Sequence, residues 1–149
     1  MSYATAPKLA ERVGPAIFIQ LTAEAGATVP DNGVASAHLA TASLLINSML
    51  GGRYAVPVVR ATAPDEVYAQ LGEWECSIAL YKAWAFRGVE PQNNPAKLEF
   101  DIVMDTLRGI RDAKIPGPAG LPLRAADTTS PLANTNYGWT SEEPHFDPP

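Results

Sequence analysis

Residues 34–57 read VASAHLATASLLINSMLGGRYAVP, and this stretch decides the fold class. Its apolar residues recur every three or four positions, which is the spacing of one helix face and not the alternation of a strand: Ala35, Leu39, Ala42, Ile46 and Met49. The pair Gly51-Gly52 predicts the end of this helix, in the left-handed backbone geometry that glycine adopts without penalty. Residues 53–63 are then expected to be an extended connection, because Pro57 lacks a backbone donor and permits at most an edge strand.

Helix patterns lie on both sides of this stretch. Residues 5–14 fit a short helix, and the apolar patch at 17–21 fits either a further helical turn or a packed loop. Two longer helices are expected at 64–87 and at 94–115, since each begins at a proline and ends at glycine or proline. We therefore predict an all-α fold, a small bundle of about four helices with an extended inter-helix loop, formed by residues 1–115.

Residues 116–149 are expected to be a long Pro-rich C-terminal tail. They hold seven of the 14 prolines and have neither a helical period nor enough apolar residues for a core, so alone they should be extended or disordered. Three aromatic residues nevertheless stand in this otherwise polar segment, namely Tyr137, Trp139 and Phe146. Because large aromatic side chains often anchor protein interfaces, we predict that the tail docks on another protein chain.

Length and composition exclude several classes of protein. The chain has 149 residues, about one domain, and 46% of them are hydrophobic, which is enough for a core. The net charge of −5 and the absence of a basic patch argue against a free-standing nucleic-acid binder. No apolar run approaches the roughly 18 to 20 residues of a membrane span, so no membrane association is expected.

The N-terminus and the cysteine content point to the cytoplasm as the place of synthesis. The first residues lack the basic and apolar regions of a signal peptide. The single cysteine, Cys76, allows neither an internal disulfide nor a cysteine-based zinc site. A reducing compartment fits such a chain best.

Catalytic constellations are poor, and we expect no enzyme activity, no metal and no cofactor. His38 lies on a predicted helix without an acid at neighbouring helical positions, and His145 lies in the tail. Cys76 has the pattern of an inert helix thiol. Asp101 and Asp105 share a helix face, but two carboxylates make a weak metal site, and a salt bridge to Arg108 is favoured.

Arg53 and Tyr54, just after the predicted helix end, admit two interpretations. Tyr54 could fold into the core behind a helix cap. Alternatively, the pair could be contact residues at a subunit boundary, since arginine and tyrosine are enriched at interface hot spots. The sequence favours neither one.

Several segments resemble the Mu-like phage and prophage head–tail connector proteins. The most distinctive is residues 42–57, ASLLINSMLGGRYAVP, which is similar to a helix running into a Gly-Arg-Tyr-x-Leu-Pro type sequence in that family. The opening at residues 3–14, the third helix and the fourth helix are similar to its other blocks, so the resemblance spans about residues 2–116. Asn47 stands where the family pattern has an acid, and Met49 where it has an aromatic residue.

The resemblance implies a structural adaptor in the virion neck. Such a protein forms a cyclic ring, twelve-fold by family analogy, between the portal protein and the stopper or tail-terminator protein. DNA passes through its lumen without sequence-specific binding, and an acidic lining would let the duplex slide. Arg53, Tyr54 and the three tail aromatics would contact the portal or a neighbouring subunit. The alternative from another class is a small helical binding or regulatory module that acts as a monomer or dimer.

Overall fold

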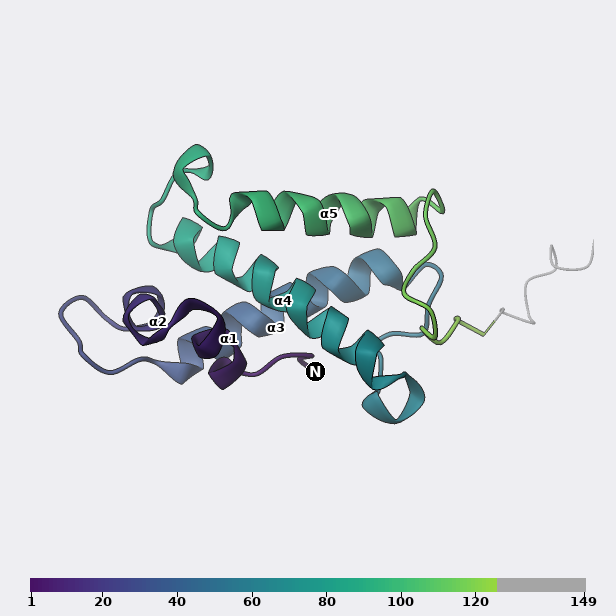
Figure 1. The fold of residues 1–149 in the computed structure, drawn as a ribbon, viewed down its shortest axis with the longest axis horizontal. Coiled ribbons are helices and arrows are strands. Elements are labelled where there is room, and N and C mark those ends of the chain that lie inside the picture. Colours follow the sequence, from purple (N-terminus) through teal and green to yellow (C-terminus); the bar gives the residue numbers. More distant parts are fainter. Residues whose placement is uncertain (126–149) are drawn as a thin grey trace, which may run out of the picture.

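The computed structural model describes residues 1–125 and is helical through most of them (Figure 1). Along this part of the chain five α-helices and two 3₁₀ turns follow in the order α1 Ala6–Val13, α2 Pro15–Thr22, α3 Asn32–Leu50, η1 Arg60–Thr62, α4 Asp65–Phe86, η2 Pro91–Asn93 and α5 Lys97–Arg111. Within residues 1–125 the β pairing is limited to an isolated bridge between Tyr54 and Leu123. The prediction of an all-α fold is confirmed.

Helices α1 and α3 begin where the sequence supplies a capping side chain. The hydroxyl of Thr5 accepts a hydrogen bond from the backbone N–H of Lys8, and Pro7 lies in the first turn of α1. At the start of α3, the carboxylate of Asp31 accepts from the N–H groups of Gly33, at 2.7 Å, and Val34, at 3.2 Å. These bonds satisfy backbone donors that have no partner inside the helix.

The structure resolves one open alternative and corrects the start of one predicted helix. The patch at 17–21 is helical, because Gly14, with φ +80°, turns the chain and Pro15 then starts α2. The last long helix begins at Lys97 and not at Asn94, whose side chain accepts a hydrogen bond from the N–H of Ala96 at 2.9 Å.

The predicted left-handed end of α3 is wrong. The helix does end at Leu50, but Gly51 has φ −62°, and Gly52 is not among the glycines with positive φ. A Cβ atom at Gly51 would lie 3.0 Å from the carbonyl oxygen of Asn47 and 3.2 Å from Val56. A small residue is therefore needed at this position because the following connection passes close to the helix end.

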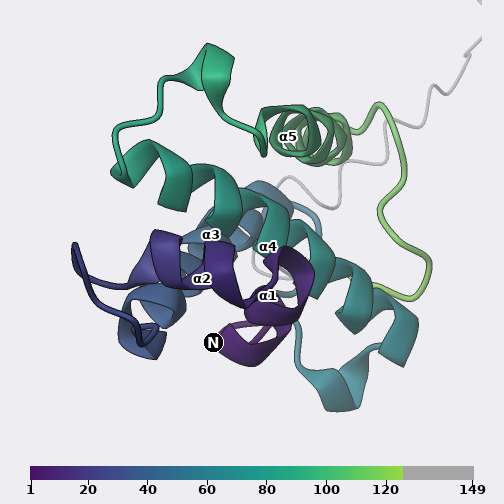
Figure 2. The same ribbon diagram turned by 60° about the vertical axis from the view of Figure 1, so that its left-hand side comes forward.

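Three long helices make the body of the fold, and two short ones cover one end of it. Helix α4 crosses between α3 and α5, and α1 and α2 pack on α3 (Figures 1 and 2). The largest fully buried apolar side chains come from both groups of helices: Leu9, Leu21, Leu39, Ile46, Leu50, Leu71, Ile78, Leu107 and Ile110. One core therefore holds the described helices together.

The apolar character of α3 departs from the expectation that no segment approaches a membrane span. By length and composition alone it could cross a membrane, with a mean hydropathy of 1.3 over its most apolar window. In the structure α3 contacts α1, α2, α4 and α5, which is the position of a core helix. Packing inside the bundle explains its apolar stripe of Ala35, Leu39, Ala42, Ile46 and Leu50, and 33% of the most apolar window is buried.

Candidate functional site: the tail anchor and an apolar groove

The first residues of the predicted tail lie against the body and form what we call the tail anchor, residues 116–124. Tyr54 follows the turn after α3, where the N–H groups of Arg53 and Tyr54 both donate to the carbonyl of Leu50 at 3.0 Å. The Tyr54 side chain is buried, and its hydroxyl accepts a hydrogen bond from the N–H of Gly117 at 3.0 Å. The end of the bundle is therefore tied to the start of the tail.

A short antiparallel bridge completes the tail anchor. The N–H of Ala55 donates to the carbonyl of Pro122 at 2.8 Å, and the N–H of Arg124 donates to the carbonyl of Arg53 at 3.0 Å. Leu121 is buried in the core, whereas Leu123 is exposed. These contacts fix where the chain leaves the body, at the end of the bundle on the right of Figure 1.

Arg53 and Tyr54 are thus brought together with the tail, in different environments. The guanidinium of Arg53 donates to the carbonyl of Ile110 at 3.2 Å, where a cation suits the C-terminal end of α5, and lies 5.9 Å from the Tyr54 ring centre. Arg53 remains exposed, while Tyr54 belongs to the core of the single chain. Their predicted contact with another subunit stays a prediction. Tyr137, Trp139 and Phe146 lie outside the described residues.

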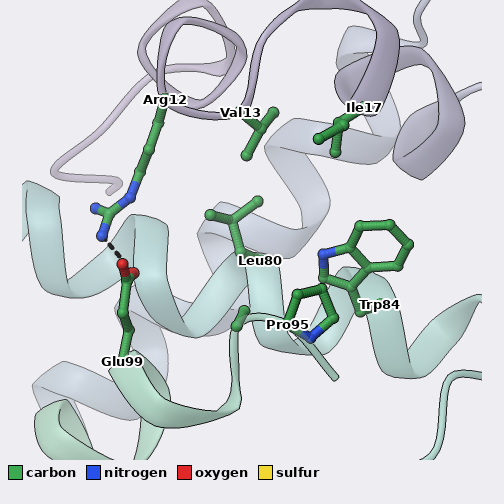
Figure 3. Close-up of a pocket in the computed structure, with 8 residues that line it drawn as sticks. Arg12, Val13, Ile17, Leu80, Trp84, Pro95 and Glu99 are labelled. Atoms are coloured by element: carbon green, nitrogen blue, oxygen red, sulfur yellow. Dashed lines mark hydrogen bonds and ion pairs between the residues drawn. The ribbon is translucent and has the colours of Figure 1, made fainter. Parts of the chain in front are cut away.

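A second feature is an apolar groove at the opposite end of the bundle, between α1–α2 and the facing parts of α4 and α5 (Figure 3). Its volume is about 290 Å³, and it is lined by Arg12, Val13, Ile17, Leu80, Trp84, Pro95, Ala96 and Glu99. The floor is aliphatic and aromatic, and the indole of Trp84 lies beside Pro95. The size is at the lower end of small-molecule pockets and suits one or two side chains.

The rim of the groove is closed by ion pairs. Arg12 contacts Glu73 at 2.7 Å and Glu99 at 2.6 Å, and its guanidinium also donates to the hydroxyl of Ser77 at 3.0 Å. Lys8 pairs with Glu73 at 2.8 Å, and together with Arg12 it holds the pKa of that carboxyl below its usual value. The charges at the rim therefore balance one another.

A buried carboxylate that the sequence pattern did not single out, Glu75, holds the N-terminal segment. Its oxygens accept hydrogen bonds from the hydroxyl of Ser2, from the N–H of Tyr3 at 2.6 Å and from the N–H of Ala4 at 2.7 Å. Burial raises the pKa of this carboxyl, and the three hydrogen bonds act in the opposite direction. A hint was present, because Glu75 falls on the helical stripe of Leu71 and Ile78.

The phenol of Tyr3 connects the same segment to α3 and to the connection after it. Its hydroxyl donates to the side-chain oxygen of Asn47 and accepts from the N–H of Val58 at 3.1 Å. Asn47 is the position where the resemblance leads one to expect an acid. An amide oxygen can accept this phenol proton without placing a charge near Glu75.

Within residues 1–125 the groups considered for catalysis have separate partners, and His145 lies outside the described residues. His38 packs edge-to-face on Phe86 with ring centres 5.7 Å apart, and burial lowers its pKa, helped by the charges of Lys82 and Arg87. Asp105 pairs with Arg108 as expected, at 2.9 Å, while Asp101 pairs with Lys97. Within residues 1–125 no three metal-ligating side chains gather at one place.

Cys76 should react with thiol reagents only after unfolding. The side chain is fully buried, and burial raises the pKa of its thiol to about 11, so thiolate is scarce at neutral pH. At pH 8 we expect labelling by a chromogenic disulfide reagent to follow the unfolding rate and to be complete at once in denaturant. Rapid stoichiometric labelling of the folded chain would contradict the buried position.

Comparison with known proteins assigns the family. None of the curated proteins compared matches the chain. The family described as bacteriophage Mu, Gp36 matches residues 3–136. The match includes the tail anchor and extends about 20 residues beyond the resemblance expected from the sequence, and it stops just before Tyr137. The chain therefore belongs to the bacteriophage Mu Gp36 family.

Proposed function

We propose that this phage structural or morphogenesis protein is an adaptor of the virion neck. It would form a ring, twelve-fold by family analogy, between the portal protein and the stopper or tail-terminator protein, with DNA passing through the lumen. It would act without catalysis and without a membrane. It would be made in the host cytoplasm and assembled at the head–tail interface.

The observation that carries this proposal is the tail anchor. The chain is held at one end of the bundle by the hydrogen bond between Gly117 and Tyr54 and by the bridge at Leu123. Residues 126–149 follow this attachment in the sequence. A rigid body with a tail leaving at a defined place suits a subunit that joins neighbours head to tail. Membership of a phage family supports the same assignment.

The distribution of charge along the chain supports a passive DNA channel, because most of the net negative charge lies in one segment. Residues 126–149 contain four of the 16 acidic residues and none of the 11 basic ones. Four of the five net negative charges therefore belong to this segment, and the body is nearly neutral. If the tails border the lumen, they would repel the duplex and let it slide.

Truncation after Ala125 should separate folding from assembly. The cut keeps Leu121 and the bridge at Leu123, so the body should keep the far-ultraviolet spectrum and the unfolding midpoint of the full chain. In a phage whose own copy of the gene is deleted, we expect the truncated chain to give filled heads and separate tails in electron micrographs. The full chain, supplied in the same way, should restore joined particles.

Two results would count against the adaptor. Normal joining with the truncated chain would remove the role of the tail. A neck reconstruction of complete particles without a ring of this chain would remove the adaptor itself and favour the monomeric or dimeric binding module.

A further inference from the structure

We propose that the apolar groove receives the segment around Tyr137 and Trp139 of a neighbouring copy of this chain. The proposal rests on the ring described above, because it names the contact that would join its subunits. It assigns a receiving surface to the predicted docking tail. The groove and the segment around Tyr137 and Trp139 would then be the two halves of one repeated interface.

The chemistry of the groove selects an uncharged apolar guest. Ile17, Leu80 and Trp84 give it an apolar floor, on which the indole of Trp84 can pair with an aromatic side chain, and Pro95 adds an apolar ring beside it. Arg12 is already shared between Glu73 and Glu99, so the rim has little charge to offer a ligand. Its volume of about 290 Å³ suits one or two large side chains.

The tail contains one segment that fits this description. Residues 134–139 read NTNYGW, which places two aromatic rings and three hydrogen-bonding side chains in a run without charge. The following residues 142–147 read EEPHFD and would bring three further carboxylates beside Glu99, which is already paired with Arg12. The neutral segment is therefore the better guest. Gly138 permits many backbone conformations, so the rings of Tyr137 and Trp139 can point in different directions.

The proposed ring favours a neighbour as the source of the guest, because its subunits need a contact between unlike surfaces. The described chain ends beside the last turns of α3 and α5 (Figure 1), whereas Pro95, Ala96 and Glu99 line the groove near the start of α5. The chain between Ala125 and Tyr137 can span about 40 Å when extended, which exceeds the roughly 22 Å length of α5, so reach alone permits either source. Repeating such a contact between unlike surfaces gives a ring when the rotation closes.

A peptide titration tests the contact with the full-length chain. A labelled peptide of residues 131–149 is added to the full chain carrying Trp139→Ala, and binding is followed by fluorescence anisotropy. We expect saturable binding that weakens at least tenfold when Ile17→Glu is added to the protein. The same loss is expected when the peptide itself carries Trp139→Ala.

Matched variants distinguish loss of the groove contact from unfolding of the chain. Ile17 is 40% exposed, so a glutamate there should be tolerated, and an unchanged unfolding midpoint would show it. Leu44 is 69% exposed and lies outside the groove, so Leu44→Glu adds the same charge elsewhere and should leave peptide binding unchanged. Equal losses for Ile17→Glu and Leu44→Glu would overturn the assignment to the groove.

A comparison with the unsubstituted chain separates a neighbour's tail from the chain's own. At dilute protein, a tail that docks on its own groove would block the peptide. We expect the unsubstituted chain to bind the peptide within twofold of the Trp139→Ala chain, and much weaker binding would overturn the neighbour as the source. Absence of binding up to millimolar protein would overturn the groove contact.

The outcome is independent of the adaptor test. A ring of this chain at the neck together with no peptide binding removes this inference and leaves the adaptor. Peptide binding together with virions that lack the chain keeps the contact and removes the adaptor.

Discussion

Replacing Glu75 with alanine is expected to lower the free energy of unfolding by about 3 kcal/mol, since each buried donor left without an acceptor costs about 1–3 kcal/mol. The carboxylate is the acceptor for the N–H groups of Tyr3 and Ala4, both of which lie in buried residues. Without it the N-terminal segment loses its attachment to α4. Urea unfolding followed by circular dichroism measures the change.

The control for this prediction is Glu73→Ala. Glu73 is two residues away on the same helix, its side chain is 54% exposed, and it pairs with Lys8 and Arg12. Exposed ion pairs contribute about 0–1 kcal/mol, so this variant should change stability little. Equal effects of the two substitutions would contradict the role assigned to the buried carboxylate.

Glutamine at position 75 should behave in the opposite way to alanine. Its amide oxygen can accept from Tyr3 and Ala4, both of which donate to a single oxygen of Glu75, and its NH₂ group can donate to the hydroxyl of Ser2. The charge, whose burial is unfavourable, disappears. Glu75→Gln should therefore be at least as stable as the natural chain at pH 7.

The pH dependence has a definite sign. The folded-state pKa of Glu75 is raised above its ordinary value of 4.5, so folding takes up a proton in the interval between the two. The unfolded chain binds fewer protons there, and the free energy of unfolding falls as the pH rises from 4.5 through the folded-state pKa. Glu75→Gln should remove this part of the slope.

Gly117→Ala is expected to loosen the tail anchor and to lower the free energy of unfolding by about 2 kcal/mol, within the range for overpacked sites. A Cβ atom there would lie 2.7 Å from the hydroxyl oxygen of Tyr54 and 2.9 Å from its ring. The phenol is buried in the core, so it can withdraw only by shifting against its neighbours there. The hydrogen bond from Gly117 to Tyr54 should be lost as the segment moves away.

Hydrogen exchange shows where the effect arises. The amides of Ala55 and Arg124 bond across the bridge, so their exchange should become faster in Gly117→Ala while the amides of α4 stay protected. Gly52→Ala is the matched control, since no heavy atom lies within 4 Å of a Cβ at that position. Unchanged exchange at Ala55 and Arg124 would contradict the anchoring role of Gly117.

The helices could be predicted because their signals are local. Each of these signals acts within a few residues: the apolar stripe of α3, the capping carboxylate of Asp31, the proline before α4 and the acids in the first turn of α4. The patch at 17–21 stayed open because it is too short to display a period. The glycine at position 51 suggested a left-handed helix end, but the space available there is limited by Val56, which approaches to 3.2 Å of a Cβ atom. A contact with the following connection cannot be read from the local sequence.

The candidate site was less accessible to sequence reasoning. Arg53 and Tyr54 stood out, but core and interface call for the same residue types, and only the Tyr54–Gly117 contact shows that the ring is buried in the single chain. The groove joins residues near positions 12, 80 and 95, whose proximity no spacing reveals. Glu75 was passed over because its partners lie more than 70 residues away.

By itself, the sequence determined that the chain is helical, where most helices begin and end, and that it resembles a family of Mu-like phages. Helical period, caps and glycine–proline punctuation suffice for this because they act over one or two turns. Only the tertiary structure decided that residues 116–124 pack on the body, that Glu75 holds the N-terminus and that a groove opens opposite the tail anchor. These features depend on contacts between distant segments, which arise when one common core brings them together.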